Sequence, residues 1–292
     1  MEPCAPSDSD LDREAAVTLL CTLAAVYAAT RDDVVELSLD SGGKAGAFVY
    51  PQSGGSLRQL GRVLDLSGLD AADRAVLEAL WRRIPSRRCG VRALVGGGLS
   101  LFWPIDLDAV AISCLTTALD FSAASAQAGR FVCAVGRPAC GIAYERAPGH
   151  AARWRIYHMA HGAVELQAAL AAAVRYVGVR AADADWLGGW AAPARGGGFA
   201  APVVVNLAFD SGGSRSIKLE LPGVPVAPVP AERGLDAAAA EVWRTAAAWA
   251  ACARCDRFNY LGVRCDARGR RGLTTYMDGQ AWISARGEEA AA

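Results

Sequence analysis

The stretch VVELSLDSGGKAGAFVYP, residues 34–51, holds the pattern that decides the fold: an apolar run, a Gly-bearing turn and a second run ending in an aromatic residue. Its turn begins at Asp40, and Tyr50 lies ten positions later. A shorter copy, RALVGGGLSLFWP, occupies residues 92–104 and turns on 96–98. Full copies with the same spacing occupy 141–159, 205–223 and 261–279, counted from Ala147, Asp210 and Asp266.

Each copy predicts a β-hairpin, because two apolar runs flank a turn that contains glycine. Neighbouring turns lie about 50 to 65 residues apart, slightly longer than the usual repeat-array unit, which leaves room for one hairpin and one or two helices. Five hairpins give ten antiparallel strands. A twisted sheet of that size tends to curl, and closure removes its exposed edges.

We therefore predict an α+β fold, namely a closed antiparallel ten-stranded β-barrel surrounded by an outer ring of helices. Residues 1–292 would form a single domain built from about five helix-hairpin repeats. A barrel of this size is wider than the eight-stranded kind that side chains alone can fill. We expect its lumen to hold two small molecules.

Between the hairpins the apolar period changes from two to about 3.6, the period of a helix. Apolar stripes predict helices over 19–27, 76–84, 164–177 and 242–253, the second behind a cap at Ser67 or Asp70. Glycine and proline make 188–198 and 223–230 typical of loops, and the last ten residues are typical of a frayed end. Residues 130–140 fit either an extra strand or a tight connection.

The charge composition excludes some classes of partner. Thirty basic and thirty acidic residues leave no net field, which argues against nucleic acid or a membrane surface. The longest uncharged stretch, 15–30, is too short to span a bilayer, and the acidic residues before it do not suit a secretory signal. Nine scattered cysteines suit reduced thiols. We expect a cytoplasmic protein that binds small molecules.

Side chains alternate along a strand, so positions eight and ten after each anchor share one face. On a solvent-facing sheet these residues would be ordinary surface residues. If they face a lumen, the cations among them need an anion, which a diphosphate would supply. The tyrosine rings would then face a carbocation and exclude water. The residues are Phe48 and Tyr50, Arg155 and Tyr157, Lys218 and Glu220, and Thr274 and Tyr276, with Arg153 two positions before Arg155.

Glu36 is the acid of the first predicted strand. At the rim of a sheet it would be a solvated glutamate. Inside a lumen it could accept a proton from an aromatic N–H group or ring carbon that comes within hydrogen-bond reach.

These residues resemble motifs of the soluble aromatic prenyltransferases of the ABBA or PT-barrel fold, particularly the dimethylallyltryptophan synthase-like branch. Glu36, Leu37 and Ser38 look like that branch's catalytic-base strand, and RWRIY at 153–157 is similar to its R-x-K-x-Y diphosphate strand. The order of helices and hairpins extends the resemblance over most of the chain. It implies an enzyme of secondary metabolism that transfers an allylic group, such as dimethylallyl, from its diphosphate to an indole or other electron-rich aromatic acceptor.

The resemblance also implies roles for individual residues. Glu36 would be the catalytic base, and such an enzyme requires no cofactor, with magnesium an open option. Diphosphate binding would fall to Arg153, Arg155, Lys218, Tyr157 and Tyr276. An aromatic shield around the substrates would be formed by Tyr50, Trp103, Tyr157 and Tyr276.

The sequence departs from the family pattern in three places. Phe48 stands where an arginine is expected, and Glu220 where a tyrosine is expected. The fourth predicted strand offers Ser100, Phe102 and Trp103 in place of a lysine. Fewer cations imply a weaker diphosphate cradle, and removal of one preorganised donor costs about 3 kcal/mol of barrier.

Other motifs give weaker indications of metal binding. Asp32, Asp33 and Glu36 spell D-D-x-x-E, but that magnesium motif needs a helix and Glu36 is expected in a strand; either aspartate could still hold magnesium near a rim. The histidines lack an apparent third ligand, and the single C-x-x-C lacks a second pair. These residues are His150, His158 and His161, and Cys252 and Cys255.

The residues favour an aromatic prenyltransferase, through Glu36 and the R-x-R-x-Y strand. One alternative, favoured by the missing cations, is a non-catalytic barrel that binds a hydrophobic small molecule or an inactive relative of these enzymes. Another is a repeat-built interaction scaffold whose central cavity is filled by side chains. No G-x-S-x-G elbow, P-loop or dinucleotide fingerprint supports a hydrolase, NTPase or oxidoreductase.

Overall fold

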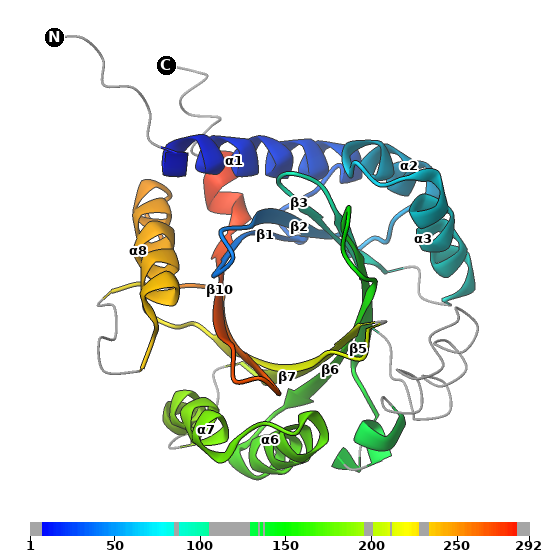
Figure 1. Ribbon diagram of the computed structural model, residues 1–292. Helices are drawn as coiled ribbons and strands as arrows, with labels where there is room; N and C mark the ends of the chain where they lie inside the picture. Colours follow the sequence, from blue (N-terminus) through cyan, green and yellow to red (C-terminus); the bar gives the residue numbers. More distant parts are fainter. Residues whose placement is uncertain are drawn as a thin grey trace, which may run out of the picture.

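The structure is a computed structural model that describes residues 8–84, 88–104, 129–133, 135–136, 138–195, 201–210, 212–227 and 234–284. Its elements alternate between helices and hairpins (Figure 1). In chain order they are α1 (Asp8–Tyr27), β1 (Val34–Asp40), β2 (Ala45–Tyr50), α2 (Leu57–Leu66), α3 (Ala71–Arg83), β3 (Gly90–Leu94), β4 (Leu99–Trp103), β5 (Gly141–Arg146), β6 (Arg153–Ala160), α6 (Ala163–Val177), α7 (Ala181–Arg195), β7 (Val203–Asp210), β8 (Arg215–Pro222), α8 (Ala237–Cys252), β9 (Tyr260–Asp266) and β10 (Arg271–Asp278).

These strands form one closed antiparallel barrel in the order β1-β10-β9-β8-β7-β6-β5-β4-β3-β2. Each strand therefore pairs with its neighbours in sequence, and the ring closes where β1 pairs with β10, with Ser38 opposite Tyr276. Figure 1 looks along the barrel and shows the helices lying outside the ring of strands. The predicted closed ten-stranded barrel with outer helices is confirmed.

The repeated spacing in the sequence corresponds to one repeated turn. In three hairpins an aspartate Oδ1 accepts the backbone N–H four residues later, at 2.8 to 3.1 Å. The third residue after each aspartate adopts positive φ, between 73° and 80°, which glycine tolerates at little cost. Its N–H donates to the aspartate carbonyl oxygen. The pairs are Asp40 and Gly43, Asp210 and Gly213, and Asp266 and Gly269.

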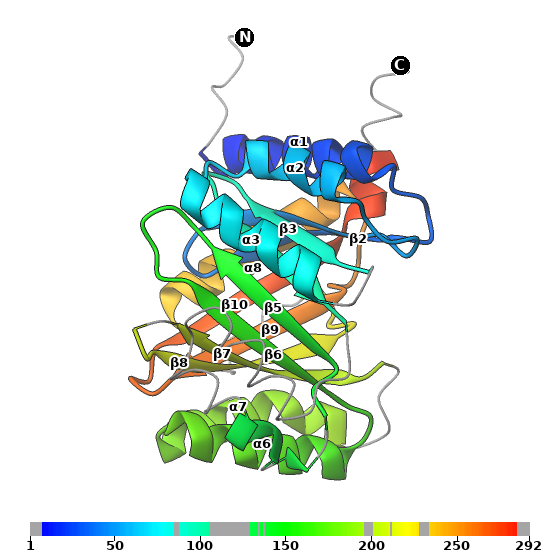
Figure 2. The ribbon, with the colours of Figure 1, turned by 90° about the vertical axis from the view of Figure 1, so that its right-hand side faces the viewer.

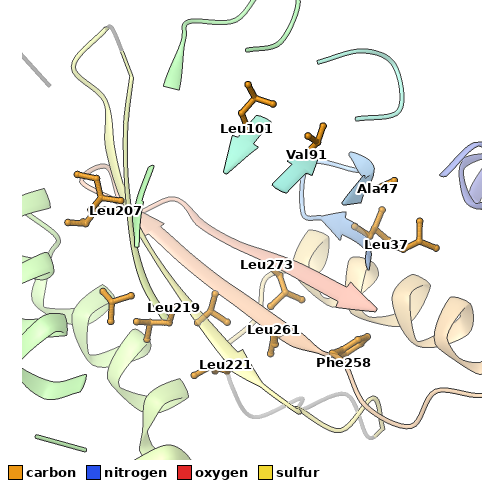
Figure 3. Packing of buried hydrophobic residues seen from close by; sticks show 14 of the residues in the cluster. Leu37, Ala47, Val91, Leu101, Leu207, Leu219, Leu221, Phe258, Leu261 and Leu273 are labelled. Carbon is orange, nitrogen blue, oxygen red and sulfur yellow. The ribbon is translucent and has the colours of Figure 1, made fainter. Parts of the chain in front are cut away.

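Alternation along the strands divides the sheet into an outer and an inner wall. The outer wall is apolar, and its side chains are buried between the sheet and the helices (Figure 3). Helix α1 packs on β1 and β2, and α6 and α7 pack on β7 to β9 (Figure 2). Helix α8 packs on β10 (Figure 1). Burial of each large apolar side chain contributes about 1.5 to 3 kcal/mol, so this layer is a major stabilising term. Fully buried outer-wall residues include Leu37, Val91, Leu101, Leu219 and Leu261.

The helices predicted from apolar stripes are present as α1, α3, α6 and α8. The N-cap of α3 is Asp70, whose carboxylate accepts the N–H of Asp73 at 2.8 Å. No helix of the described residues is long and apolar enough to cross a lipid bilayer.

Two helices depart from the sequence predictions. Helix α2 was not predicted, although Ser56 and Gln59 form its capping box. The prediction of a loop over 188–198 was wrong for its described part, because α7 continues to Arg195. Ring packing of Trp186 on Trp190, with centroids 6.3 Å apart, spans the two glycines between them. Of the described residues between 130 and 140, 130–133 and 135 are helical and Ala139 forms a bridge, so they make a connection and add no strand to the barrel.

Glycines on the inner wall make room for its larger side chains. A Cβ atom on Gly262 would lie 2.2 Å from Cε of Lys218, and one on Gly90 would lie 2.6 Å from the Phe48 ring. At Gly46 the obstruction is backbone, since a Cβ atom would lie 2.9 Å from the carbonyl oxygen of Ala93 on β3. Close approach of neighbouring strands therefore depends on this glycine.

We predict that Gly46→Ala destabilises the protein by about 1 to 3 kcal/mol, because the clash with β3 requires a backbone shift. Gly61→Ala is the matched control: nothing lies within 4 Å of its added methyl group in α2. Alanine there should raise the free energy of unfolding, by up to about 1 kcal/mol. Urea unfolding measures both, and equal stabilities for Gly46→Ala and the wild type would contradict the close approach.

Candidate active site

A row of paired residues crosses neighbouring strands on the inner wall. Backbone pairing places Glu36 of β1 opposite Phe48, Phe48 opposite Arg92, and so on around the barrel. Lys218 and Tyr276 lie on the same wall, on β8 and β10. The strands thus bring the predicted base and the predicted cations into one interior. The row from β1 to β6 is Glu36, Phe48, Arg92, Ser100, Glu145 and Arg153.

Glu36 is a buried carboxyl group, with 8% of its surface exposed. Its Oε1 accepts a hydrogen bond from Nδ2 of Asn259 at 3.2 Å. Burial raises the pKa of Glu36 to about 7. The hydrogen bond from Asn259 lowers this pKa, and the negative charge of Glu220 raises it. The positive charges of Lys218 and Arg92 lower it. Glu36 therefore exchanges a proton near neutral pH, as a general base requires.

Lys218 joins β8 to β10. Its Nζ donates to the hydroxyl of Tyr276 and forms an ion pair with Oε1 of Glu220 at 2.9 Å. The ammonium also lies 4.5 Å from the centroid of the Tyr276 ring, within cation–π range. Burial lowers the pKa of Lys218 to about 8, although Glu220 acts in the opposite direction. Lys218 is a cation at neutral pH and loses its proton above about pH 8.

Arg155 on β6 has an internal counter-ion. Its Nη2 donates to Oε2 of Glu145 on β5 at 2.6 Å. Burial alone would raise the pKa of Glu145, but the charge of Arg155, followed by those of Arg153 and Arg92, lowers it to about 2. Glu145 is therefore an anion at physiological pH, and it compensates the charge of Arg155.

Aromatic rings lie beside these charges. The Phe102 ring is 4.9 Å from the ring of Tyr157 and 6.4 Å from that of Tyr50, both edge to face. Burial raises the pKa of Tyr157 and of Tyr276. Both hydroxyl groups keep their protons and can donate to an anion, while the ring faces can stabilise a cation.

The structure places one predicted shield residue elsewhere. Trp103 alternates with Phe102 along β4, lies on the same side as Leu101 and is fully buried in the outer wall. The prediction that Trp103 shields the substrates was therefore wrong, and Phe102 is the ring of β4 on the inner wall. The other predicted residues share the inner wall, namely Glu36, Tyr50, Arg153, Arg155, Tyr157, Lys218 and Tyr276.

Sequence reasoning missed Arg92, Glu145 and Asn259. The carbonyl oxygens of Asp40 and Leu94 accept the equivalent turn hydrogen bonds in the first hairpin and the short hairpin. Arg92 precedes Leu94 by the same number of residues as Ser38 precedes Asp40, so counting backwards from the turns would have found it. Glu145 could have been found in the same way from the Ala147 anchor. Asn259 has no such signal, because its contact with Glu36 spans 223 positions of the chain.

The metal-binding motifs do not assemble in the part of the chain that the structure describes, where no three potential ligands of the His, Cys, Asp and Glu types cluster. Both carboxylate oxygens of Asp33 accept hydrogen bonds, from the backbone N–H groups of Thr30 and Gln52. His158 lies on the outer wall against the Phe131 ring. His150 lies 3.5 Å from the Lys44 ammonium in a turn.

A closed ten-stranded barrel with outer helices and a polar inner wall is a PT barrel, the fold of aromatic prenyltransferases. The fold implied by the sequence resemblance is thus confirmed. The chain is similar to the 5-dimethylallyltryptophan synthase from Streptomyces coelicolor, with 13% identity and a TM-score of 0.53 over 93% of this chain and 98% of that one.

Two further solved structures show the same fold. One is PriB in a binary complex with product diphosphate, at 18% identity and a TM-score of 0.53 over 93% of this chain and 97% of that one. The other is the 6-dimethylallyltryptophan synthase from Micromonospora olivasterospora, at 15% identity and 0.53 over 95% and 99%. No protein-family model and no curated protein matches the chain by sequence. Function must therefore be argued from the side chains.

The raised pKa of Glu36 has a consequence for stability. The folded protein holds this proton more tightly than the unfolded chain, so the free energy of unfolding should fall as pH rises from about 5 to about 8. In the wild type this decrease in the free energy of unfolding should be on the order of 1 to 3 kcal/mol, and it should be absent in Glu36→Gln. Urea unfolding at both pH values measures the slope. Glu78→Gln, on the partly exposed face of α3, should keep the wild-type slope, and an unchanged slope in Glu36→Gln would refute the assignment.

Proposed function

We propose that the protein is an aromatic prenyltransferase, which transfers a dimethylallyl or longer allylic group from its diphosphate to an indole or other electron-rich aromatic ring. The observation that carries this proposal is the placement of a carboxyl group with a pKa near 7, Glu36, within electrostatic reach of Lys218 and Arg92 inside one closed barrel. Such an enzyme needs a base and an anion site within one substrate's length of each other.

The proposed reaction begins when the bond between the allylic carbon and the diphosphate oxygen breaks, and the electron pair leaves with the diphosphate. The inner-wall cations and the hydroxyl groups of Tyr157 and Tyr276 would stabilise the developing negative charge. Tyrosine and phenylalanine rings would face the allylic cation and keep water away. The aromatic acceptor then forms the new bond to the allylic carbon, and its displaced proton passes to the Glu36 carboxylate.

Structures with the same fold support this substrate class. The Micromonospora olivasterospora enzyme is described in complex with DMASPP and Trp, and PriB with product diphosphate. In this chain the mid-barrel carboxylates already have partners, Asn259 for Glu36, Arg155 for Glu145 and Lys218 for Glu220. They do not fit a protein-held magnesium ion, so we assign no step to one. We further propose that the enzyme acts in the cytoplasm, in secondary metabolism.

A second candidate function is a non-catalytic barrel that binds a hydrophobic small molecule. The ion pairs favour it, because Glu145 and Glu220 already compensate Arg155 and Lys218 and so reduce their attraction for a diphosphate. Under this alternative an apolar ligand would bind, but allylic diphosphate would not be consumed.

Turnover distinguishes the two candidates. We expect the wild type, given dimethylallyl diphosphate with tryptophan, indole and phenolic acceptors, to release diphosphate and to yield a product heavier by one prenyl group. Glu36→Gln should lower kcat by about 100-fold or more with little effect on donor affinity, since it removes the proton acceptor. Lys218→Ala should weaken donor affinity by about 10- to 100-fold. If both variants match the wild type in both assays, the assigned roles are wrong.

The pH dependence of kcat/KM should be bell-shaped. Activity should rise through about pH 7 as Glu36 ionises, and fall above about pH 8 as Lys218 loses its proton. Lys218→Arg provides the sharper test, because a guanidinium stays charged and should move the falling limb to higher pH. A falling limb that stays in place in Lys218→Arg would remove Lys218 from this role.

A further inference from the structure

Arg92 is an inner-wall cation without a carboxylate partner. Its Nη2 donates to the neutral hydroxyl of Ser38 at 2.8 Å, and its Nε is buried without a hydrogen-bond acceptor. Among the described residues, no carboxylate lies within ion-pair distance of this guanidinium. A partly buried guanidinium whose Nε–H has no acceptor is costly unless an anion is supplied from outside the chain.

The two neighbouring cations differ in this respect. Arg155 is paired with Glu145 at 2.6 Å, and Lys218 with Glu220 at 2.9 Å. Each of these cations must share or give up its carboxylate partner before it can hold an anionic ligand. Arg92 loses only a hydrogen bond to a hydroxyl group, so its full charge and its free Nε–H are available to a ligand.

The position of Arg92 also suits an anion close to the proposed chemistry. Its guanidinium carbon lies 5.9 Å from the centroid of the Tyr276 ring, whose hydroxyl group is bound by Lys218. Its charge acts on both Glu36 and Lys218. Its backbone pairs with that of Phe48, which stands in the first hairpin where the family pattern would place an arginine.

We propose that Arg92 binds the diphosphate group of the allylic donor, supplying from β3 the charge that Phe48 lacks on β2. A planar guanidinium with free donors can bind two oxygens of one phosphate. When the allylic carbon–oxygen bond breaks, the electron pair stays on the diphosphate, and Arg92 stabilises the added charge. This inference rests on the proposed function and concerns the same site.

Direct binding of inorganic diphosphate tests the inference without turnover. Isothermal titration calorimetry should show that Arg92→Gln weakens binding by about 10- to 100-fold, the range expected for a charge-assisted hydrogen-bonding partner. Arg92→Lys, which keeps the charge but loses the fork, should recover part of this loss. The matched control is Arg215→Gln on the outer wall, where Arg215 donates to the carbonyl oxygen of Tyr176; it should bind like the wild type. Thermal unfolding verifies that each variant is folded.

The outcomes separate the two proposals. If the wild type and Arg92→Gln bind diphosphate equally, the role of Arg92 is refuted and the prenyltransferase proposal stands. If the wild type itself binds neither inorganic diphosphate nor dimethylallyl diphosphate, both proposals fall. A larger loss in Arg215→Gln than in Arg92→Gln would show that the effect arises from general destabilisation, and would also refute the inference.

Discussion

Closure of the sheet, where β1 pairs with β10, is the constraint on which the rest of the structure depends. Strand side chains alternate, and in a closed sheet that alternation becomes a division between inside and outside. Apolar residues such as Leu37 face the helices, while Glu36 and Ser38, its neighbours in the chain, face inward. The closing pair also sets the site, because it brings Tyr276 beside Ser38 and so completes the wall around Glu36.

Inward-facing cations carry an electrostatic cost that the chain reduces from within. Arg155 and Lys218 each have a carboxylate partner on the inner wall, which lowers the cost of burying these two charges when no anion is bound. The same pairs lower the affinity of those cations for a diphosphate. Arg92, held by a hydroxyl group alone, keeps its charge available. On the inner wall, Arg155 and Lys218 are thus compensated by carboxylates of the chain, while the charge of Arg92 is left for a ligand.

Much of the fold followed from the sequence because one turn recurs. The spacing from Asp40 to Tyr50 fixed the alternation, and with it the inward placement of Arg155 and Lys218. Prediction failed where positions were not counted from the turn. Trp103 has the strand parity of Leu99 and Leu101 in the outer wall, and Arg92 has the parity of the inner wall. The Asn259 contact depends on tertiary packing, which leaves no local pattern. Helix α7 persists through its glycines beside the Trp186–Trp190 ring pair, a local contact within one helix that outweighs the loop propensity of glycine.

Glu36 and the inner-wall cations are electrostatically linked. The charges of Lys218 and Arg92 lower the pKa of Glu36 and so oppose the larger effect of its burial. A diphosphate bound to these cations would offset their charges, and the pKa of Glu36 would rise because its anionic form loses this stabilisation. A higher pKa makes the Glu36 carboxylate a stronger proton acceptor. The Asn259 amide limits the rise, since it donates to that carboxylate while its backbone N–H is held by the carbonyl oxygen of Tyr276. Under the proposed function, donor binding would therefore prepare the base for the proton that the acceptor releases.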